Sequence, residues 1–278
     1  MRQRIPNIYH FVFGLKRQWT PFHLIHYLCL ESCRRVNQPD RIYFHYHHEP
    51  WGPYWKKIKP HLTTVKVEKD EFVEGFKYED KWIRRFRYAH HSDFIRLRQL
   101  SRYGGVYADM DTLFLQPYPD SLFSHPFVLG REGDIRDDVS GESRPSLCNA
   151  VIMAEPDSAF GNLWLQKKQE AFNGTWSNHS TILPYKLAQA HPDWIHIEPP
   201  RSFYPCMWEI KDFETLFEKT QINWKNAYSI HLWSHLWWSR RRKDFSSVHA
   251  GMFTQNYIRN VDTSFNRVAR RFLDDSQD

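Results

Sequence analysis

The chain has 278 residues, of which 41% are hydrophobic and 17% aromatic, and its 38 basic and 32 acidic residues give a formal net charge of +6. This composition excludes a disordered chain, because it supplies enough apolar surface for one large folded domain. The positive charge favours a polyanionic partner, such as a nucleotide diphosphate, an anionic membrane surface or nucleic acid, and does not distinguish among them.

Strand-like and helix-like patterns alternate along the chain, which predicts an α/β sheet flanked by helices. Strands are expected at residues 5–13, 41–45, 63–67, 106–114, 127–129, 150–154, 194–197 and 228–232. Helices are expected at residues 21–36, 84–103, 156–171, 181–190 and 253–273. The polar segment 131–145 is expected to be a mobile loop at the strand ends, because it is rich in turn-forming residues.

The helix expected at 84–103 carries an acidic and a basic residue on one face. Asp93 and Arg96 are three residues apart, and apolar residues beside them provide packing. Gly104 and Gly105 follow, and they are expected to end the helix because glycine readily adopts the left-handed conformation found at helix ends.

The next expected strand, 106–114, begins with strict alternation, so Tyr107, Asp109 and Asp111 share one face of it. An Asp-x-Asp triplet alone is weak evidence, because a chain of this composition contains about one by chance. This pair, however, ends an apolar strand directly after a helix, and open α/β sheets bind ligands outside the carboxyl ends of their strands. The two carboxylates are therefore candidates for holding a metal-bound diphosphate.

The sequence around this pair resembles the family 32 glycosyltransferases, which are sugar transferases of the type A fold. The blocks that carry the resemblance are Ser92-Asp93-Phe94-Ile95-Arg96, Tyr103-Gly104-Gly105-Val106-Tyr107 and Asp109-Met110-Asp111. Weaker similarity extends over residues 5 to 238, with a departure at Leu236, where a hydroxyl residue is expected before Trp237. The resemblance implies a GT-A-like, Rossmann-type mixed sheet in a catalytic domain at residues 1–250. An amphipathic helix at 251–278 would pack on that domain or touch a membrane.

The resemblance also implies a metal-dependent glycosyltransferase that moves a hexose from a nucleotide sugar to a saccharide or glycolipid acceptor with retained anomeric configuration. A UDP-sugar donor is favoured over a GDP-sugar, as in capsule or oligosaccharide biosynthesis. The expected cofactor is Mn²⁺ or Mg²⁺, because both prefer oxygen ligands and a divalent cation stabilises a departing diphosphate.

Three residues are expected to hold this metal. Asp111 is the predicted direct ligand, and Asp109 would contact the ribose, the sugar and the metal. His231, at the end of the strand expected at 228–232, is the predicted third ligand, and its imidazole would favour manganese modestly. The alternative for His231 is a structural role, since a lone histidine at a strand end is more often structural than metal-bound.

The resemblance assigns further residues to the donor. Asp93 and Arg96 would hold the sugar hydroxyls and one phosphate, and Asn149 would lie at the reactive face of the sugar, as a catalytic residue beside Asp109 and Asp111. The other expected donor contacts are Phe11 and Val12 at the nucleobase, with core packing as their alternative, and Tyr107, Trp233, Ser234 and Trp237.

Two other classes of function remain open at the level of sequence. A metal-dependent nucleotide-sugar hydrolase would use the same aspartates and admit water to the anomeric carbon. A basic, aromatic-rich nucleic-acid-binding module would instead use lysine and arginine contacts to phosphates. The transferase is preferred, and no nucleic-acid partner is expected.

The sequence also carries an expectation about location. No stretch reaches the roughly 18 to 20 apolar residues that span a bilayer, and the first residues lack the apolar region of a signal peptide. A cytoplasmic protein is expected, with peripheral contact at the inner face of an anionic membrane. The four cysteines lack metal-like spacing and are expected to be reduced. The basic run 240–243 is expected to be a solvated face or to border a diphosphate site.

Overall fold

The computed structural model describes residues 3–136, 140–220, 224–238 and 247–273, and the basic run expected at 240–243 lies outside them. A mixed seven-stranded sheet with the order β10-β6-β9-β4-β1-β2-β3 forms the centre of the molecule. Its strands are β1 (Ile8–Phe13), β2 (Arg41–Tyr46), β3 (Thr63–Lys66), β4 (Gly105–Ala108), β6 (Phe127–Arg131), β9 (Leu147–Ala154) and β10 (His196–Glu198). Antiparallel β9 separates the parallel group β4-β1-β2-β3 from the parallel pair β6-β10. The expected mixed α/β sheet is confirmed.

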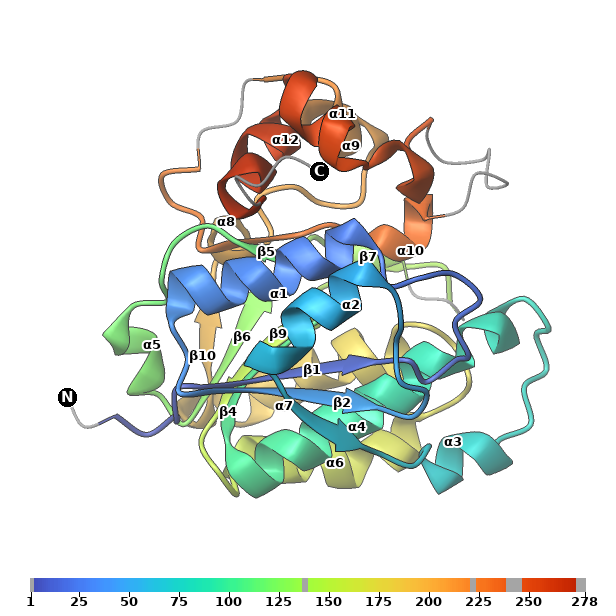
Figure 1. Ribbon diagram of the computed structural model, residues 1–278. Coiled ribbons are helices and arrows are strands. Elements are labelled where there is room, and N and C mark those ends of the chain that lie inside the picture. The colour runs from blue at the N-terminus through green and yellow to red at the C-terminus, as the bar shows by residue number, and fades with distance from the viewer. Residues whose placement is uncertain (1–2, 137–139, 221–223, 239–246, 274–278) are drawn as a thin grey trace.

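Helices cover both faces of this sheet, with α4 and α6 on one side and α1 on the other (Figure 1). The longer helices are α1 (Leu24–Asn37), α4 (Arg87–Tyr103), α6 (Ala159–Ala171), α7 (Leu183–Ala190) and α9 (Ile210–Phe217). The short α-helices are α2 (Pro53–Ile58), α3 (Glu71–Gly75), α5 (Asp120–Phe123), α8 (Pro200–Phe203), α10 (Ser234–Trp237), α11 (Gln255–Asn260) and α12 (Ser264–Ala269). The 3-10 turns are η1 (Lys59–His61), η2 (Ile83–Phe86), η4 (Pro192–Trp194), η5 (Ala250–Met252) and η6 (Arg270–Phe272), and η3 (Asn178–Ile182) is a π-helix.

The hydrophobic core is divided between the two faces of the sheet. Val106 and Ala108 of β4 belong to the cluster that includes α1, and Tyr107 belongs to the cluster that includes α4 and α6. This division follows from the alternation of side chains along a strand. The four cysteines are buried and free, as expected for reduced thiols.

The strand expected at 106–114 is wrong as a single element. β4 ends at Ala108, and β5 (Thr112–Phe114) pairs antiparallel with β11 (Ser229–His231) in a separate two-stranded sheet. The chain turns between them, where the Thr112 amide donates to the Asp109 carbonyl at 3.0 Å. The turn is required because β4 and β5 belong to different sheets, and it leaves both aspartates at the carboxyl end of β4.

The glycines before β4 act as expected at the end of α4. Gly104 and Gly105 have φ angles of 64° and 100°. A Cβ on Gly105 would lie 2.5 Å from the Ile8 carbonyl oxygen, so the close pairing of β4 with β1 also requires glycine there.

The single C-terminal helix expected at 253–273 is also wrong. Thr254 and Thr263 cap two separate helices, α11 and α12, by accepting hydrogen bonds from Tyr257 and Asn266 amides at 3.1 and 3.0 Å. Threonine hydroxyls favour helix starts, so the second cap interrupts the amphipathic pattern. With α9, these helices form an additional layer beyond α1 (Figure 1). The segment expected as a loop at 131–145 contains two short paired strands, β7 (Ile135–Arg136) and β8 (Ser143–Arg144).

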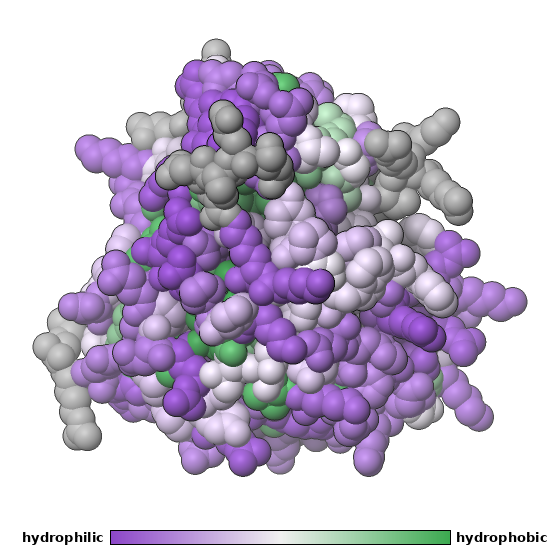
Figure 2. All heavy atoms as spheres, in the orientation of Figure 1, coloured by the Kyte–Doolittle hydropathy of each residue, from purple (hydrophilic) through white to green (hydrophobic). Residues whose placement is uncertain are grey.

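The face of the molecule in Figure 2 is mostly hydrophilic, and hydrophobic residues reach it only in small separate patches. Within the described ranges, the helices are all too short or too polar to cross a lipid bilayer.

Candidate active site

A cavity of about 980 Å³ opens beyond the carboxyl ends of β1 and β4. Its wall comes from the β1–α1 segment, the start of α4, the turn after β4, the π-helix η3 and α10. In sequence these segments fall within residues 12–26, 82–96, 107–111, 176–181 and 231–238, with Pro50 and Asn149. This is the edge of an α/β sheet at which ligands bind.

Asp109, Asp111 and His231 converge in this cavity, with one ligand atom of each within 4.8 Å of the others. The His231 Nε2 lies 3.2 Å from Asp111 Oδ1 and 3.8 Å from Asp109 Oδ2. The pairing of β11 with β5 places His231 opposite Thr112, directly after the aspartate turn. Two carboxylates and one imidazole form a donor set that fits a divalent cation.

The three side chains influence one another's protonation. Burial lowers the pKa of His231, but the carboxylates of Asp111 and Asp109 outweigh it and raise that pKa. Burial raises the pKa of Asp111, but His231 and the Ser234 amide, which donates to Oδ2 at 2.7 Å, hold it well below its usual range. Burial raises the pKa of Asp109, although Arg96 opposes this. A proton on His231 and a divalent cation would therefore compete for the same position beside the two carboxylates.

The residue before Ser234 explains how its amide reaches Asp111. Trp233 has φ 51° and ψ 41°, a left-handed conformation that is rare for a bulky residue and costs on the order of 1–3 kcal/mol. Its indole Nε1 donates to the Cys206 carbonyl at 3.0 Å, which helps to hold it. The resulting bend between β11 and α10 directs the Ser234 amide toward Asp111.

Arg96 connects the aspartates of α4 and of the turn. Its Nη2 lies 3.2 Å from both Asp93 Oδ1 and Asp109 Oδ1, and its Nη1 donates to the Asn149 carbonyl at 2.6 Å. The guanidinium also lies over the Tyr107 ring, 4.4 Å from its centroid, and the Tyr107 hydroxyl donates to Asp109 at 2.5 Å. Arg96 therefore holds α4, β4 and β9 together beneath the cavity.

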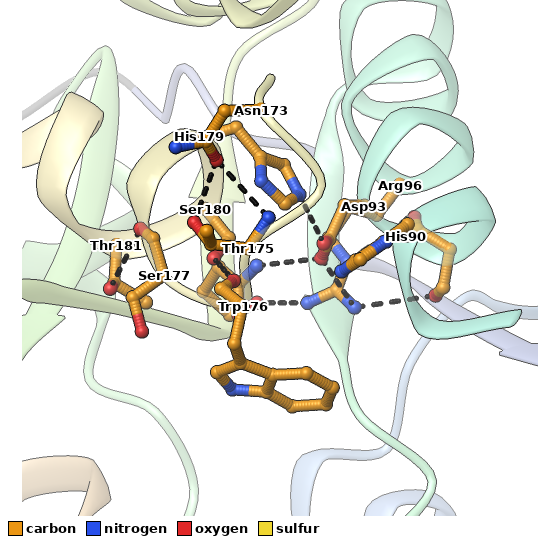
Figure 3. A network of polar contacts seen from close by, with 12 residues as sticks. His90, Asp93, Arg96, Asn173, Thr175, Trp176, Ser177, His179, Ser180 and Thr181 are labelled. Atoms are coloured by element: carbon orange, nitrogen blue, oxygen red, sulfur yellow. Dashed lines mark hydrogen bonds and ion pairs between the residues drawn. The ribbon is translucent and has the colours of Figure 1, made fainter. Parts of the chain in front are cut away.

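Asp93 is fully engaged by its neighbours, as Figure 3 shows for Arg96 and His179. Its Oδ1 accepts from Asn149 Nδ2 at 2.8 Å and its Oδ2 from His179 Nε2 at 2.9 Å. Burial alone would raise the pKa of Asp93, but Arg96 and His179 lower it well below its usual range. The carboxylate is therefore ionised and fixed in orientation.

His179 is a site residue that sequence reasoning missed. It is one of 16 histidines, and nothing in its spacing to Asp93, which is 86 residues away, distinguishes it. Its position in the π-helix η3 is a structural signal, since such helices occur frequently at functional sites. That signal becomes visible only when the backbone is known.

The remaining predicted donor residues divide into two groups. Val12, Tyr107, Trp233 and Ser234 line the cavity. Phe11 and Trp237 are not among the residues that line it, and their donor contacts stay a prediction. Strand alternation places Phe11 on the α1 face, fully buried, opposite to Val12. Trp237 donates from Nε1 to the Leu232 carbonyl at 2.6 Å and is buried beneath α10.

A buried lysine lies behind the Asp93 network. Lys168 is fully buried, its Nζ has no hydrogen-bond partner among the described residues, and it lies 4.7 Å from the Trp164 ring centroid. Burial lowers the pKa of Lys168 to about 7, and the nearby Asp93 carboxylate only partly opposes this effect.

We expect a pH-dependent stability difference between the wild type and a Lys168→Met variant. In the unfolded chain the lysine pKa is about 10.4, so between about pH 7 and pH 10 the unfolded state binds a proton that the folded state releases. The free energy of unfolding of the wild type should therefore rise with pH relative to the variant, by up to about 1.4 kcal/mol per pH unit. Urea denaturation from pH 6 to pH 10 measures this, and a difference independent of pH would contradict it.

Sequence comparisons with known proteins match the segment that contains the aspartates. The profile described as a glycosyltransferase sugar-binding region containing a DXD motif matches residues 28–128, which include Asp93, Arg96, Asp109 and Asp111. Glucan organizing enzyme 1 of Cryptococcus neoformans var. grubii serotype A is 30% identical over 283 residues, covering 99% of this chain and 72% of that protein.

Solved structures of glycosyltransferases are also similar. GlyE of Streptococcus pneumoniae TIGR4 is 11% identical, with 96% of this chain and 60% of that chain covered and a TM-score of 0.48. The PaToxG glycosyltransferase is 17% identical, with 68% of this chain and 70% of that chain covered and a TM-score of 0.43.

Proposed function

Since the chain belongs to the DXD-containing glycosyltransferases of family 32, we propose that its cavity binds a nucleotide sugar at Asp109 and Asp111 and transfers the sugar to a saccharide acceptor. The observation that carries this proposal is the convergence of Asp109, Asp111 and His231 at the carboxyl end of β4. A divalent cation bound there would supply Lewis-acid stabilisation of the departing diphosphate.

The residues of the chain itself have separate tasks in this proposal. Asp109 and Asp111 would hold the cation, and His231 would be the third ligand once it has lost its proton. Asp93 and Arg96, fixed by Asn149 and His179, hold the hydroxyls of the donor sugar in one orientation. Positioning of this kind lowers the barrier to transfer, because the reacting groups are aligned before the reaction.

We propose that transfer retains the anomeric configuration. Of the described residues that line the cavity, the only carboxylates are Asp93, Asp109 and Asp111. Asp93 is held by two hydrogen bonds and the Arg96 ion pair at the proposed position of the donor hydroxyls, and the other two belong to the proposed cation site, so we assign none of the three as a general base for inversion. In the retaining reaction the departing phosphate oxygen accepts the acceptor's proton.

The proposal also specifies the donor, the cation, the class of acceptor and the location of the protein. We propose a UDP-hexose as donor and Mn²⁺ as the cation, because an imidazole ligand favours manganese over magnesium modestly. The name of the Cryptococcus relative refers to glucan, which supports a polysaccharide or oligosaccharide acceptor. A cytoplasmic location with peripheral membrane contact is part of the proposal.

A thermal-shift panel tests the proposed donor. We expect UDP-sugars to raise the melting temperature in the presence of Mn²⁺ and to have little effect without it, because a ligand that binds only the folded state stabilises it by mass action. At a concentration about 100 times the dissociation constant, the stabilisation is about 2.7 kcal/mol. GDP-, CMP- and dTDP-sugars serve as comparisons. A shift with a different nucleotide would replace the UDP assignment, and no shift with any nucleotide would overturn the transferase.

A further inference from the structure

Exposed aromatic side chains gather at the mouth of the cavity. Of the eight large hydrophobic side chains that are exposed among the described residues, three line this cavity, namely Trp19, Trp82 and Tyr88, with exposed fractions of 78%, 51% and 37%. Single exposed hydrophobic residues are ordinary, but several around one opening indicate a binding surface. Trp82 directly precedes η2, and Tyr88 lies in the first turn of α4.

An unbroken series of ring contacts leads from this mouth into the cavity. The ring centroids of Trp82 and Phe86 are 5.6 Å apart, those of Phe86 and Trp176 are 5.6 Å apart, and those of Trp176 and His235 are 5.0 Å apart. We call Trp82, Phe86, Tyr88, Trp176 and His235 the aromatic wall, and all five line the cavity. In Figure 3 the Trp176 ring points away from the Asp93 and His179 contacts.

One end of the aromatic wall is next to the proposed reaction centre in sequence. His235 follows Ser234 in α10, and the Ser234 amide donates to Asp111. The wall therefore runs from the exposed Trp82 to the sequence neighbour of Ser234, whose amide binds one of the predicted cation ligands. A chain-like ligand that lies along it would have one end at the donor sugar.

The outer end of the wall offers polar contacts as well as a ring face. The Arg85 guanidinium carbon lies 5.3 Å from the Trp82 ring centroid, close enough for a cation–π contact that steadies the indole. Arg85 forms no ion pair with the described residues, so its N–H groups can donate to hydroxyl groups of a ligand beside the indole.

The size of the cavity leaves room for a second ligand. Sites for one small organic ligand have volumes of about 300–1,000 Å³. The 980 Å³ found here is at the upper limit, and the cavity is lined both by predicted donor contacts, such as Val12, Asp109 and Asp111, and by the aromatic wall. The aromatic wall is the part of this lining to which the predicted donor contacts assign no role.

The geometry points to an oligosaccharide acceptor of at least two pyranose units, bound along the aromatic wall with one ring at Trp176 and the next at Trp82. This inference rests on the proposed transferase function. One face of a pyranose ring is composed of C–H groups, which pack against the electron-rich face of an indole, while its hydroxyls at the edge accept and donate hydrogen bonds. Two tryptophans separated by Phe86 provide two such positions, one deep and one at the mouth.

Equilibrium binding tests the inference. The probes are oligosaccharides of one, two and four units from α-1,3-glucan, β-1,3-glucan and mannan, titrated by calorimetry into the protein saturated with UDP and Mn²⁺. For at least one series, we expect the Kd of the wild type to fall about fivefold or more between one and two units, because the second ring gains a stacking contact. Trp82→Ala should remove this gain, and Trp82→Phe should keep part of it.

A matched control is Trp194→Ala, because Trp194 is 39% exposed and is not among the residues that line the cavity. It should bind all probes like the wild type. The inference is overturned if Kd does not depend on chain length, if no probe binds, or if Trp194→Ala and Trp82→Ala lose affinity equally. Its failure is distinct from failure of the transferase, since the latter would appear as the absence of metal-dependent stabilisation by any nucleotide sugar.

Discussion

Replacement of Asp111 by asparagine is expected to lower kcat about 10³-fold and to abolish the dependence of turnover on Mn²⁺. The carboxylate approaches His231 at 3.2 Å and accepts the Ser234 amide at 2.7 Å, so it is both charged and fixed in place. Asparagine keeps an oxygen for the Ser234 amide but removes the charge that would hold the cation. A cation at a departing diphosphate contributes several kcal/mol to transition-state stabilisation, which corresponds to roughly three decades in rate.

Release of nucleoside diphosphate at increasing Mn²⁺ concentrations measures this effect. The melting temperature of the Asp111→Asn variant without ligand should stay close to that of the wild type, since the amide hydrogen bond survives. Asp193→Asn serves as the control, because Asp193 lies in η4 and is not among the residues that line the cavity. Wild-type activity of Asp111→Asn at saturating Mn²⁺ would remove Asp111 from the mechanism.

The Arg96→Met variant is expected to lose about 3–5 kcal/mol of unfolding free energy. Arg96 is 4% exposed and lies 3.2 Å from both Asp93 and Asp109, so methionine would leave the buried Asp93 and the partly buried Asp109 without their cation. Removing one member of a buried ion pair costs this much because the remaining charge is desolvated and uncompensated. The Asn149 carbonyl would also lose the donor that now lies at 2.6 Å.

Arg4→Met provides a matched comparison at the surface. Arg4 donates to both carboxylate oxygens of Glu155, at 2.6 and 2.7 Å, but its side chain is 47% exposed. Water solvates the partners of such a pair when it is broken, so the loss should be at most about 1 kcal/mol. Urea denaturation followed by circular dichroism compares the two variants at pH 7. Equal losses would show that Arg96 does not compensate buried charge.

Local sequence determined those parts of the protein that depend on neighbouring residues. The spacing of Asp93 and Arg96 places both on one face of α4, and Gly104 and Gly105 end that helix, because these features require only helical geometry and the conformational freedom of glycine. The alternation in β4 likewise places Tyr107 on the opposite face of the sheet from Val106 and Ala108. The Asp-x-Asp block and its surroundings also indicated the family.

Strand pairing decided the arrangement at the aspartates. The sequence predicts one continuous strand through Asp109 and Asp111, whereas the chain turns there because β4 and β5 join different sheets. The same pairing brings His231 to Asp111 over a separation of 120 residues. Hydrophobic alternation in the sequence does not indicate which strands pair with each other. The turn at the aspartates and the position of His231 therefore could not be predicted without the strand order.

Tertiary structure also decided which side chains meet in the cavity. The contact between His179 and Asp93 depends on η3 packing against α4, and the burial of Phe11 and Trp237 depends on what covers each element. In the C-terminal segment, a period of apolar residues suggested one helix, but the Thr263 cap and packing against α9 favoured two. Sequence periodicity reports local geometry, whereas long-range contacts depend on the free energy of packing the whole chain.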